Sequence, residues 1–125
     1  MLQDSPIIPY IPVTDLARAR KFYENIIGFT PTQEINGGII YKCGRNTEVF
    51  MYVSGGAGTS NASQAFWQVE DIKTEMAELR SRGLVFEEYD FPGMTMDNGI
   101  ATGGGAMAAW FKDSEGNIMA IIQSM

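Results

Sequence analysis

The sequence offers few residues that could perform acid–base or nucleophilic chemistry. It has no histidine and a single cysteine, Cys43. Imidazole is the usual general base near neutral pH and the commonest transition-metal ligand. Catalytic arrangements that pair serine or cysteine with histidine are therefore excluded. One thiol also cannot form an internal disulfide, which fits a reducing, cytoplasmic location.

Carboxylates are the remaining candidates for a metal site. Glutamate side chains are mostly solvent-exposed in folded proteins, so we interpret those near predicted strands as solvated faces and strand ends. We expect no three of them to converge on a metal. The glutamates considered are Glu34, Glu48, Glu70, Glu87 and Glu88.

The glycine run Gly103–Gly105 lacks the Gly-Lys-Thr/Ser of a phosphate-binding loop, so it is only a weak signal of phosphate binding.

Length and charge limit the class of protein. A chain of 125 residues with 45% hydrophobic residues is typical of one compact domain. Its net charge of −6 opposes binding to nucleic acid and to anionic lipids. Residues 1–13 lack the basic stretch and apolar core of a signal peptide. Apolar runs such as Val49–Val53 have the length of a strand, far below that of a membrane span.

Residues 1–55 contain the pattern of one strand, one helix and three further strands. The apolar run Ile7–Val13 contains prolines, which favours an edge strand. Thr14 and Asp15 can cap a helix that ends at Gly28. Asn36-Gly37 predicts a hairpin turn in which both residues have positive φ. The predicted strands after the helix are Phe29–Ile35, Ile39–Cys43 and Glu48–Ser54.

After a small, polar linker at residues 56–63, the same pattern repeats over residues 64–125. Gln64–Val69 is a predicted strand, and Asp71 can cap a helix that stops at Gly83. The second copy is longer, and we place its insertion within Asp90–Gly105. This segment could be a lid that uses Met94 and Met96, a loop that crosses to a partner subunit, or a plain long loop. The further predicted strands are Leu84–Tyr89, Ala106–Phe111 and Asn117–Gln123.

Motifs at both ends of the chain resemble one family. Val13-Thr14-Asp15-Leu16, Lys21-Phe22-Tyr23-Glu24 and Ile27-Gly28-Phe29 resemble the opening of the vicinal oxygen chelate superfamily, which holds glyoxalase I, extradiol dioxygenases, fosfomycin-resistance enzymes and bleomycin-binding proteins. The segment Trp110–Ile118 resembles its closing signature, with Ser114 in place of the usual proline. The resemblance implies an α+β fold of two βαβββ modules that form a curled mixed sheet with a cleft, usually in a homodimer.

The resemblance also implies four metal-ligand positions, one on each of four strands. They fall here on Ile8, Gln64, Ala120 and either Phe50 or Tyr52. Only Gln64 offers a donor atom of the expected kind. A metal site needs several converging oxygen or nitrogen ligands, so we expect no metal and no other cofactor.

If the former ligand positions face the cleft, strand alternation places further side chains beside them. The resulting surface would be rich in aromatic rings with a few polar groups, which suits planar or amphipathic small molecules. The alternative is that these rings fill the sheet interior as core. The predicted ligand-binding residues are Ile8, Tyr10, Phe50, Tyr52, Gln64, Phe66, Trp110 and Ala120.

We therefore predict a homodimeric, metal-independent protein that captures a small aromatic or amphipathic molecule. Two alternatives remain. One is a glyoxalase-like lyase or a dioxygenase with an atypical site. The other is a degenerate family member whose filled cleft leaves only dimerisation.

Overall fold

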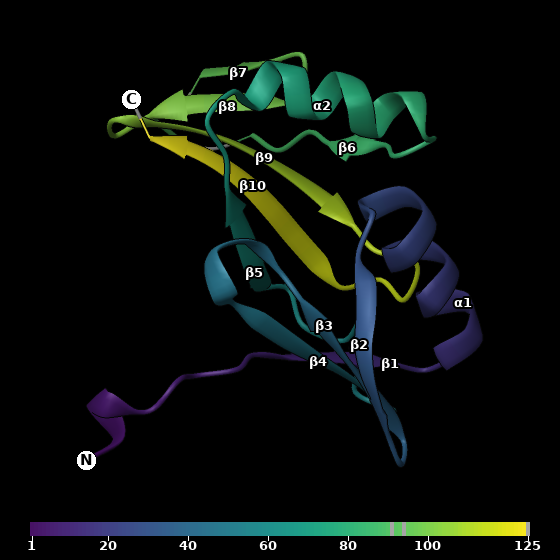
Figure 1. Ribbon diagram of the computed structural model, residues 1–125. Helices are drawn as coiled ribbons and strands as arrows, with labels where there is room; N and C mark the ends of the chain where they lie inside the picture. Colours follow the sequence, from purple (N-terminus) through teal and green to yellow (C-terminus); the bar gives the residue numbers. More distant parts are fainter. Residues whose placement is uncertain (91, 94, 125) are drawn as a thin grey trace.

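The computed structural model describes residues 1–90, 92–93 and 95–124, and it consists of two sheets with helices packed against them (Figure 1). The first sheet has the order β1-β4-β3-β2, with β1 parallel to β4 and the other pairs antiparallel. β1 therefore lies at an edge, as its prolines predicted. The elements of this module are η1 (Leu2–Asp4), β1 (Tyr10–Val13), α1 (Leu16–Lys21), the π-helical η2 (Phe22–Ile27), β2 (Thr30–Ile35), β3 (Gly38–Lys42), η3 (Gly44–Asn46) and β4 (Glu48–Val53).

The second sheet repeats this arrangement. Its order is β5-β10-β9-β8-β7, and β5 runs parallel to β10 as β1 does to β4. The predicted α+β fold of two related modules is confirmed. The elements of the second module are β5 (Ser63–Gln68), α2 (Ile72–Ser81), β6 (Phe86–Glu87), β7 (Thr95–Asp97), β8 (Ile100–Gly103), β9 (Ala106–Lys112) and β10 (Ile118–Ser124).

The strand register shows which residues of the two modules correspond. Tyr10 pairs with Phe50 between β1 and β4, and Phe66 pairs with Ala120 between β5 and β10. Tyr10 and Phe66 occupy the same place in their modules, so Phe50 is the counterpart of Ala120. The register thus resolves the choice between Phe50 and Tyr52 that the sequence left open.

Both helices begin and end as their sequences predict. The Asp15 side chain accepts a hydrogen bond from the Arg18 N–H at 3.0 Å, and Asp71 accepts one from the Thr74 N–H at 3.2 Å. Gly28 and Gly83 follow the helical segments with φ of +94° and +97°, where other residues would be strained.

The segment Asp90–Gly105 differs from the prediction. Within its described part, Thr95–Asp97 and Ile100–Gly103 form β7 and β8, a hairpin that extends the second sheet. Asn98 and Gly99 form the turn with φ of +56° and +84°, the pattern that favours a two-residue hairpin. Met94, predicted to contribute to a lid, lies outside the described residues.

Two smaller predictions also need correction. The hairpin at Asn36-Gly37 does form, but only Gly37 has a positive φ, at +83°. The predicted strand Leu84–Tyr89 is shorter than expected, because within it only Phe86 and Glu87, the residues of β6, pair with β9.

A single core lies between the inner faces of the two sheets. It takes Ile11 and Met51 from the first sheet and Phe111 and Met119 from the second, and Tyr23 from η2 lies among them. In Figure 1, α2 covers the second sheet and α1 lies where the two sheets meet. Among the described residues, no helix combines the length and apolar character needed to cross a membrane.

Candidate functional site

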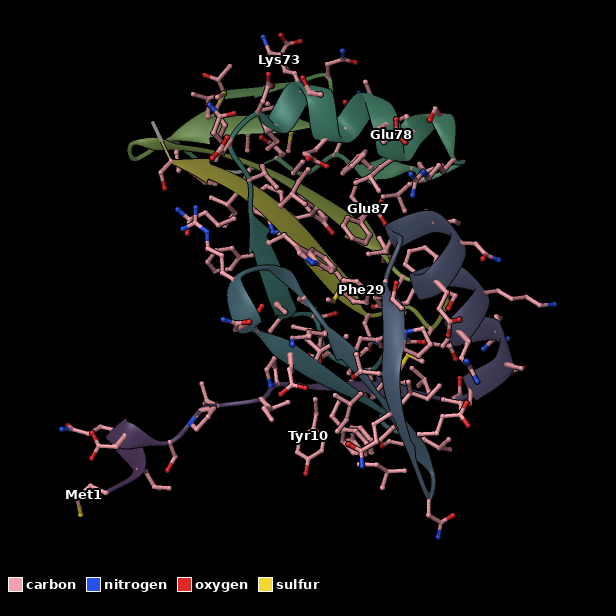
Figure 2. All side chains as sticks on the ribbon, viewed as in Figure 1. Met1, Tyr10, Phe29, Lys73, Glu78 and Glu87 are labelled. Carbon is pink, nitrogen blue, oxygen red and sulfur yellow. The ribbon has the colours of Figure 1, made fainter. Side chains whose placement is uncertain are left out.

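The outer face of the first sheet carries a cluster of aromatic rings. Tyr10 contacts Tyr52 and Phe50 with ring centroids 4.8 and 5.6 Å apart, and Phe50 stacks on Tyr52 at 6.1 Å. Tyr10 is 61% exposed, and Figure 2 shows its side chain pointing away from the body of the protein. Ile8 and Ile40 join Tyr10 and Phe50 around a shallow hollow of about 240 Å³. We call this surface the first outer face.

Gly38 leaves space on the first outer face for the ring of Phe50. A Cβ added at Gly38 would lie 2.5 Å from the Phe50 ring and 2.6 Å from the Met51 carbonyl oxygen. Only glycine therefore leaves room for Phe50 at this place. The ring cluster depends on a residue of β3 that contributes no side chain.

The corresponding second outer face holds the remaining predicted residues. Phe66, Ala120 and Trp110 lie in one row across β5, β10 and β9. Phe66 is 60% exposed, so it is not part of the core. Trp110 packs edge-on against Tyr89 with centroids 5.7 Å apart. Gln64 is half-buried and lies at an irregularity in the pairing of β5 with β10, two residues before Phe66.

The structure therefore divides the predicted residues between two surfaces. Ile8, Tyr10, Phe50 and Tyr52 belong to the first outer face; Phe66, Trp110 and Ala120 belong to the second, and Gln64 lies next to it in β5. Both surfaces lie on the sides of their sheets opposite the shared core. Within one chain, the two groups thus face away from the core and do not form a common cleft.

The family's metal-ligand positions do not fit a metal in this chain. Ile8, Phe50 and Ala120 have no donor atoms, and the amide of Gln64 cannot hold a divalent cation alone. Within the described ranges, no three Cys, Asp or Glu side chains are grouped closely enough to hold a metal ion. Of the glutamates considered above, Glu34 pairs with Arg20 at 2.7 Å, and Glu87 lies 3.9 Å from Lys112.

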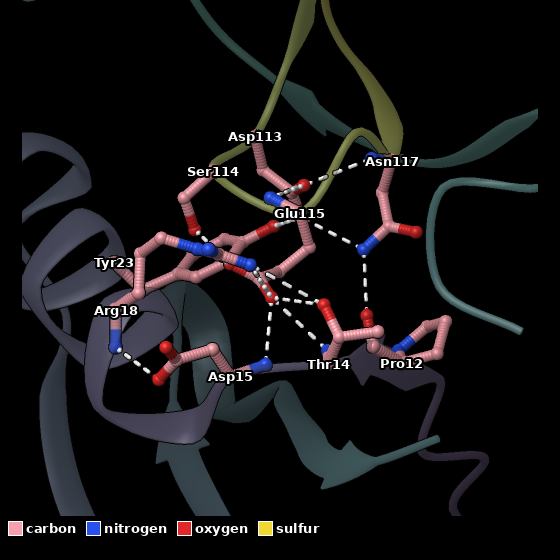
Figure 3. Close-up of polar contacts among 9 residues, drawn as sticks. All are labelled: Pro12, Thr14, Asp15, Arg18, Tyr23, Asp113, Ser114, Glu115 and Asn117. Carbon is pink, nitrogen blue, oxygen red and sulfur yellow. Dashed lines mark hydrogen bonds and ion pairs between the residues drawn. The ribbon is translucent and has the colours of Figure 1, made fainter. Parts of the chain in front are cut away.

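The densest polar cluster lies elsewhere, at the junction of the two modules (Figure 3). The side chain of Glu115, which is fully buried, accepts hydrogen bonds from the backbone N–H groups of Thr14 and Asp15 at 3.0 and 2.9 Å. Arg18 donates to both carboxylate oxygens, at 2.8 and 3.0 Å, and Ser114 donates at 2.8 Å. The Arg18 guanidinium is the main reason that the pKa of Glu115 lies well below its usual range.

Asp113 and Asn117 extend this cluster into the core. The Tyr23 hydroxyl donates to Asp113 at 2.5 Å, and burial raises the pKa of this phenol well above its usual value. Asn117 donates to the Pro12 carbonyl at 2.7 Å and accepts from the Gly58 N–H at 3.0 Å. The turn thus joins β1, η2 and the linker to the second module.

Sequence reasoning missed this junction. The segment Trp110–Ile118 resembles the closing signature of the family, but that resemblance predicts no partner for it in the first module. The spacing of Asp113, Glu115 and Asn117, which places three polar side chains in one tight turn, was the available signal. Because these groups bind one another, the cluster holds the modules together and offers no free acid or base.

Several solved structures share the fold. UcmS2 has a TM-score of 0.73 at 17% identity, covering 94% of this chain and 96% of that chain. TnmS3, an antibiotic binding protein from Streptomyces sp. CB03234, has a TM-score of 0.67 at 19% identity, covering 96% and 95%. Lactoylglutathione lyase from Agrobacterium tumefaciens has a TM-score of 0.67 at 14% identity, covering 95% and 93%. At these identities the likeness establishes the fold alone.

Comparisons of sequence place the chain in a family. No curated protein sequence matches it significantly. The profile of the Glyoxalase/Bleomycin resistance protein/Dioxygenase superfamily matches residues 7–121, which is nearly the whole chain and includes both terminal motifs. This chain therefore belongs to the Glyoxalase/Bleomycin resistance protein/Dioxygenase superfamily.

Proposed function

We propose that the protein binds a small aromatic or amphipathic molecule, without a metal, through the rings of its two outer faces. The observation that carries this proposal is the exposure of large aromatic side chains on both faces. Tyr10 and Phe66 are each about 60% exposed although they lie on regular strands. Exposed apolar patches on a folded protein mark surfaces that bind something.

Ring geometry favours a flat ligand. Phe50 and Tyr52 are nearly parallel, with 12° between their planes, and Tyr10 is inclined to them by about 60°. Such an arrangement can stack on one side of a planar molecule and contact its edge. The Tyr10 and Tyr52 hydroxyls and the Gln64 amide can then orient polar groups of the ligand.

We further propose that the binding cleft is completed by a second copy of the chain. The two outer faces point away from the shared core, so a twofold dimer could set the first outer face of one copy against the second outer face of the other. Pro9 and Pro12 limit strand pairing at the β1 edge within one chain. The ligand would then be enclosed on both sides.

We propose stoichiometric capture instead of catalysis. The chain has no histidine, and the carboxylates of the junction are occupied by internal hydrogen bonds. The fold is compatible with this role, since TnmS3 shares it and is an antibiotic binding protein. The nature of the bound molecule follows from the faces: a planar apolar body with one or two polar groups.

A fluorescent aromatic anion, 8-anilinonaphthalene-1-sulfonate, tests the proposal. We expect saturable binding by the folded protein, with the same affinity in EDTA and in added zinc or manganese. Phe66→Ala should weaken binding, whereas Val85→Ala should not, because Val85 is 77% exposed but lies outside the two faces. Binding that requires metal, or that is equally affected by both variants, would contradict the proposal.

A further inference from the structure

A cleft between the two modules adjoins the second outer face, with which it shares Phe66 as a lining residue. Its walls share Cys43, Gly44, Trp67, Gln68 and Val69, and they enclose two adjoining hollows of about 410 and 500 Å³. Hollows of this size are typical of sites for drug-sized molecules. The hollow of about 410 Å³ is lined by residues 27–30 and 42–44 of the first module and by residues 67–69, α2, β9 and β10 of the second. We call the two hollows together the inter-module cleft.

The hollow of about 410 Å³ has a floor of aromatic rings. Trp67 stacks on Phe111 with centroids 6.0 Å apart and 19° between the rings, and Phe29 lies 5.9 Å from Trp67. Figure 2 shows Phe29 between the two sheets. Leu79 of α2 and Ile27 of η2 complete an apolar lining. Phe111 is fully buried, whereas Trp67, Phe29, Leu79 and Ile27 pack against the core but are only partly buried, so these four retain surface for a ligand.

Glycine keeps the mouth of the cleft open. A Cβ added at Gly44 would meet no atom within 4 Å, so the space beside this residue is open. Since φ of Gly44 is not positive, a larger residue would fit the backbone without strain. The openness therefore results from the residue at this position and can be removed by substitution.

The two walls of the cleft carry opposite charges. Lys42 and Arg45 lie on the wall from the first module, and Glu70 and Glu75 lie on the wall from the second. In the part of the chain that the structure describes, none of these four side chains has an ion pair. They are thus available to a ligand that enters between them.

We propose that the inter-module cleft is a second binding site, specific for a planar aromatic zwitterion whose anionic end meets Lys42 and Arg45 and whose cationic end meets Glu70 and Glu75. The aromatic floor supplies stacking, and the charged walls select for separated opposite charges. This site lies within one chain and goes beyond the function proposed above, which uses the outer faces and a second copy.

The two tryptophans allow the sites to be observed separately. Trp67 lines the inter-module cleft and Trp110 lies on the second outer face. In ¹⁵N-labelled protein each gives one indole N–H signal, and Trp110→Phe identifies which is which. The test ligand is norfloxacin, a planar zwitterion near pH 7, and the matched ligand is nalidixic acid, a related ring system with the carboxylate but no amine.

We expect norfloxacin to shift the Trp67 signal in a saturable manner and to leave the Trp110 signal nearly unchanged. Nalidixic acid should bind about three- to fivefold more weakly, as the loss of one partly exposed ion pair implies. Lys42→Ala should weaken norfloxacin by a similar factor, whereas Lys73→Ala, on the exposed side of α2, should have no effect.

Blocking the cleft provides the decisive comparison. Gly44→Phe should abolish the Trp67 shift, while Gly55→Phe, at a second glycine with no atom within 4 Å of its added Cβ, should not. An unmoved Trp67 signal at millimolar norfloxacin, or equal behaviour of the two glycine variants, would overturn the proposal. A shift of the Trp110 signal alone would also overturn it, while leaving binding at the outer faces intact.

Discussion

The two outer faces have the same strand pairing but different side chains at equivalent places. On the first face, Tyr10 pairs with Phe50, and ring contacts continue to Tyr52. On the second face, Phe66 pairs with Ala120, whose methyl group is 2% exposed. One face is therefore a cluster of three rings in contact, whereas on the other a small, buried alanine lies between Phe66 and Trp110.

This difference indicates how a duplicated unit can produce two complementary surfaces. The backbone pattern of the module fixes which residues point outward, and the side chains at those places then diverge without disturbing the core. The following variants test two differences, that between the inner and outer faces and that between the two outer faces.

The largest effect is expected where an outer ring is compared with an inner one on the same sheet. Phe111→Ala removes a ring that is fully buried and should cost about 3–5 kcal/mol of unfolding free energy. Phe66→Ala removes a ring that is mostly exposed and should cost less than about 1 kcal/mol. Urea unfolding measures both. A loss of several kcal/mol for Phe66→Ala would show that this ring belongs to the core.

The next effect concerns Glu115, which holds the modules so that the outer faces point apart. Glu115→Gln should destabilise the protein by about 2 kcal/mol at pH 7, because a buried carboxylate loses charge-assisted hydrogen bonds from backbone N–H groups. Since folding lowers the pKa of Glu115, its contribution is complete above the ordinary glutamate pKa of about 4.3 and declines as the pH falls below it.

Unfolding curves of wild type and Glu115→Gln should therefore converge as the pH is lowered from about 5 toward 2. Gln123→Glu offers a control at the start of α2, where the Gln123 side chain accepts from the Ile72 N–H at 2.8 Å. The Gln123→Glu substitution keeps a side-chain oxygen that can accept the hydrogen bond from the Ile72 N–H. A stability difference for Glu115→Gln that is constant over this pH range would contradict the assigned role of its charge.

A smaller effect is expected when a methyl group is added at Gly38, beneath the aromatic rings of the first outer face. Gly38→Ala should cost about 1–2 kcal/mol, because the new Cβ collides with the Phe50 ring and the Met51 carbonyl. It should also weaken an aromatic ligand by displacing Phe50. Gly55→Ala is the control, since its Cβ enters open space. Equal melting temperatures for the two variants would show that Phe50 does not need Gly38.

The smallest effect on stability is expected at Gln64. Gln64→Leu should change the unfolding free energy by less than about 1 kcal/mol, because the half-buried amide is still in reach of water. Its effect should be on ligand preference, favouring probes without a polar group. Competition between an aromatic acid and the matching hydrocarbon measures this, and an unchanged preference would remove Gln64 from the site.

The sequence predicted the repeat, the helix caps and the alternation of the strands because these depend on local residue types. Asp15, Asp71, Gly28 and Gly83 act as their types suggest. The two Asn-Gly pairs show the limit of such reasoning. Asn98-Gly99 has the paired positive φ that was assigned to Asn36-Gly37, because the hydrogen-bonded context of each hairpin decides which turn it adopts.

Other features were not predictable because they depend on contacts between distant segments. Glu115 contacts Thr14 and Arg18, which lie about a hundred residues away in the sequence, and no local sequence pattern predicts that pairing. The inter-module cleft likewise arises from the relative placement of β3, β5 and α2. The position of the outer faces on opposite sides of a shared core also follows only from the packing of the two sheets.

The central claim, that a ligand is held between the first outer face of one copy and the second outer face of another, is tested most directly by mixing two defective variants. Tyr10→Glu disables the first face and Phe66→Glu the second, and both positions are exposed enough to accept the change. Neither variant alone should bind 8-anilinonaphthalene-1-sulfonate. After unfolding and refolding together in equal amounts, half the dimers are mixed and each has one intact cleft, so about a quarter of the wild-type sites should return. If mixing restores no binding, or if either variant alone binds as wild type does, the shared cleft is contradicted.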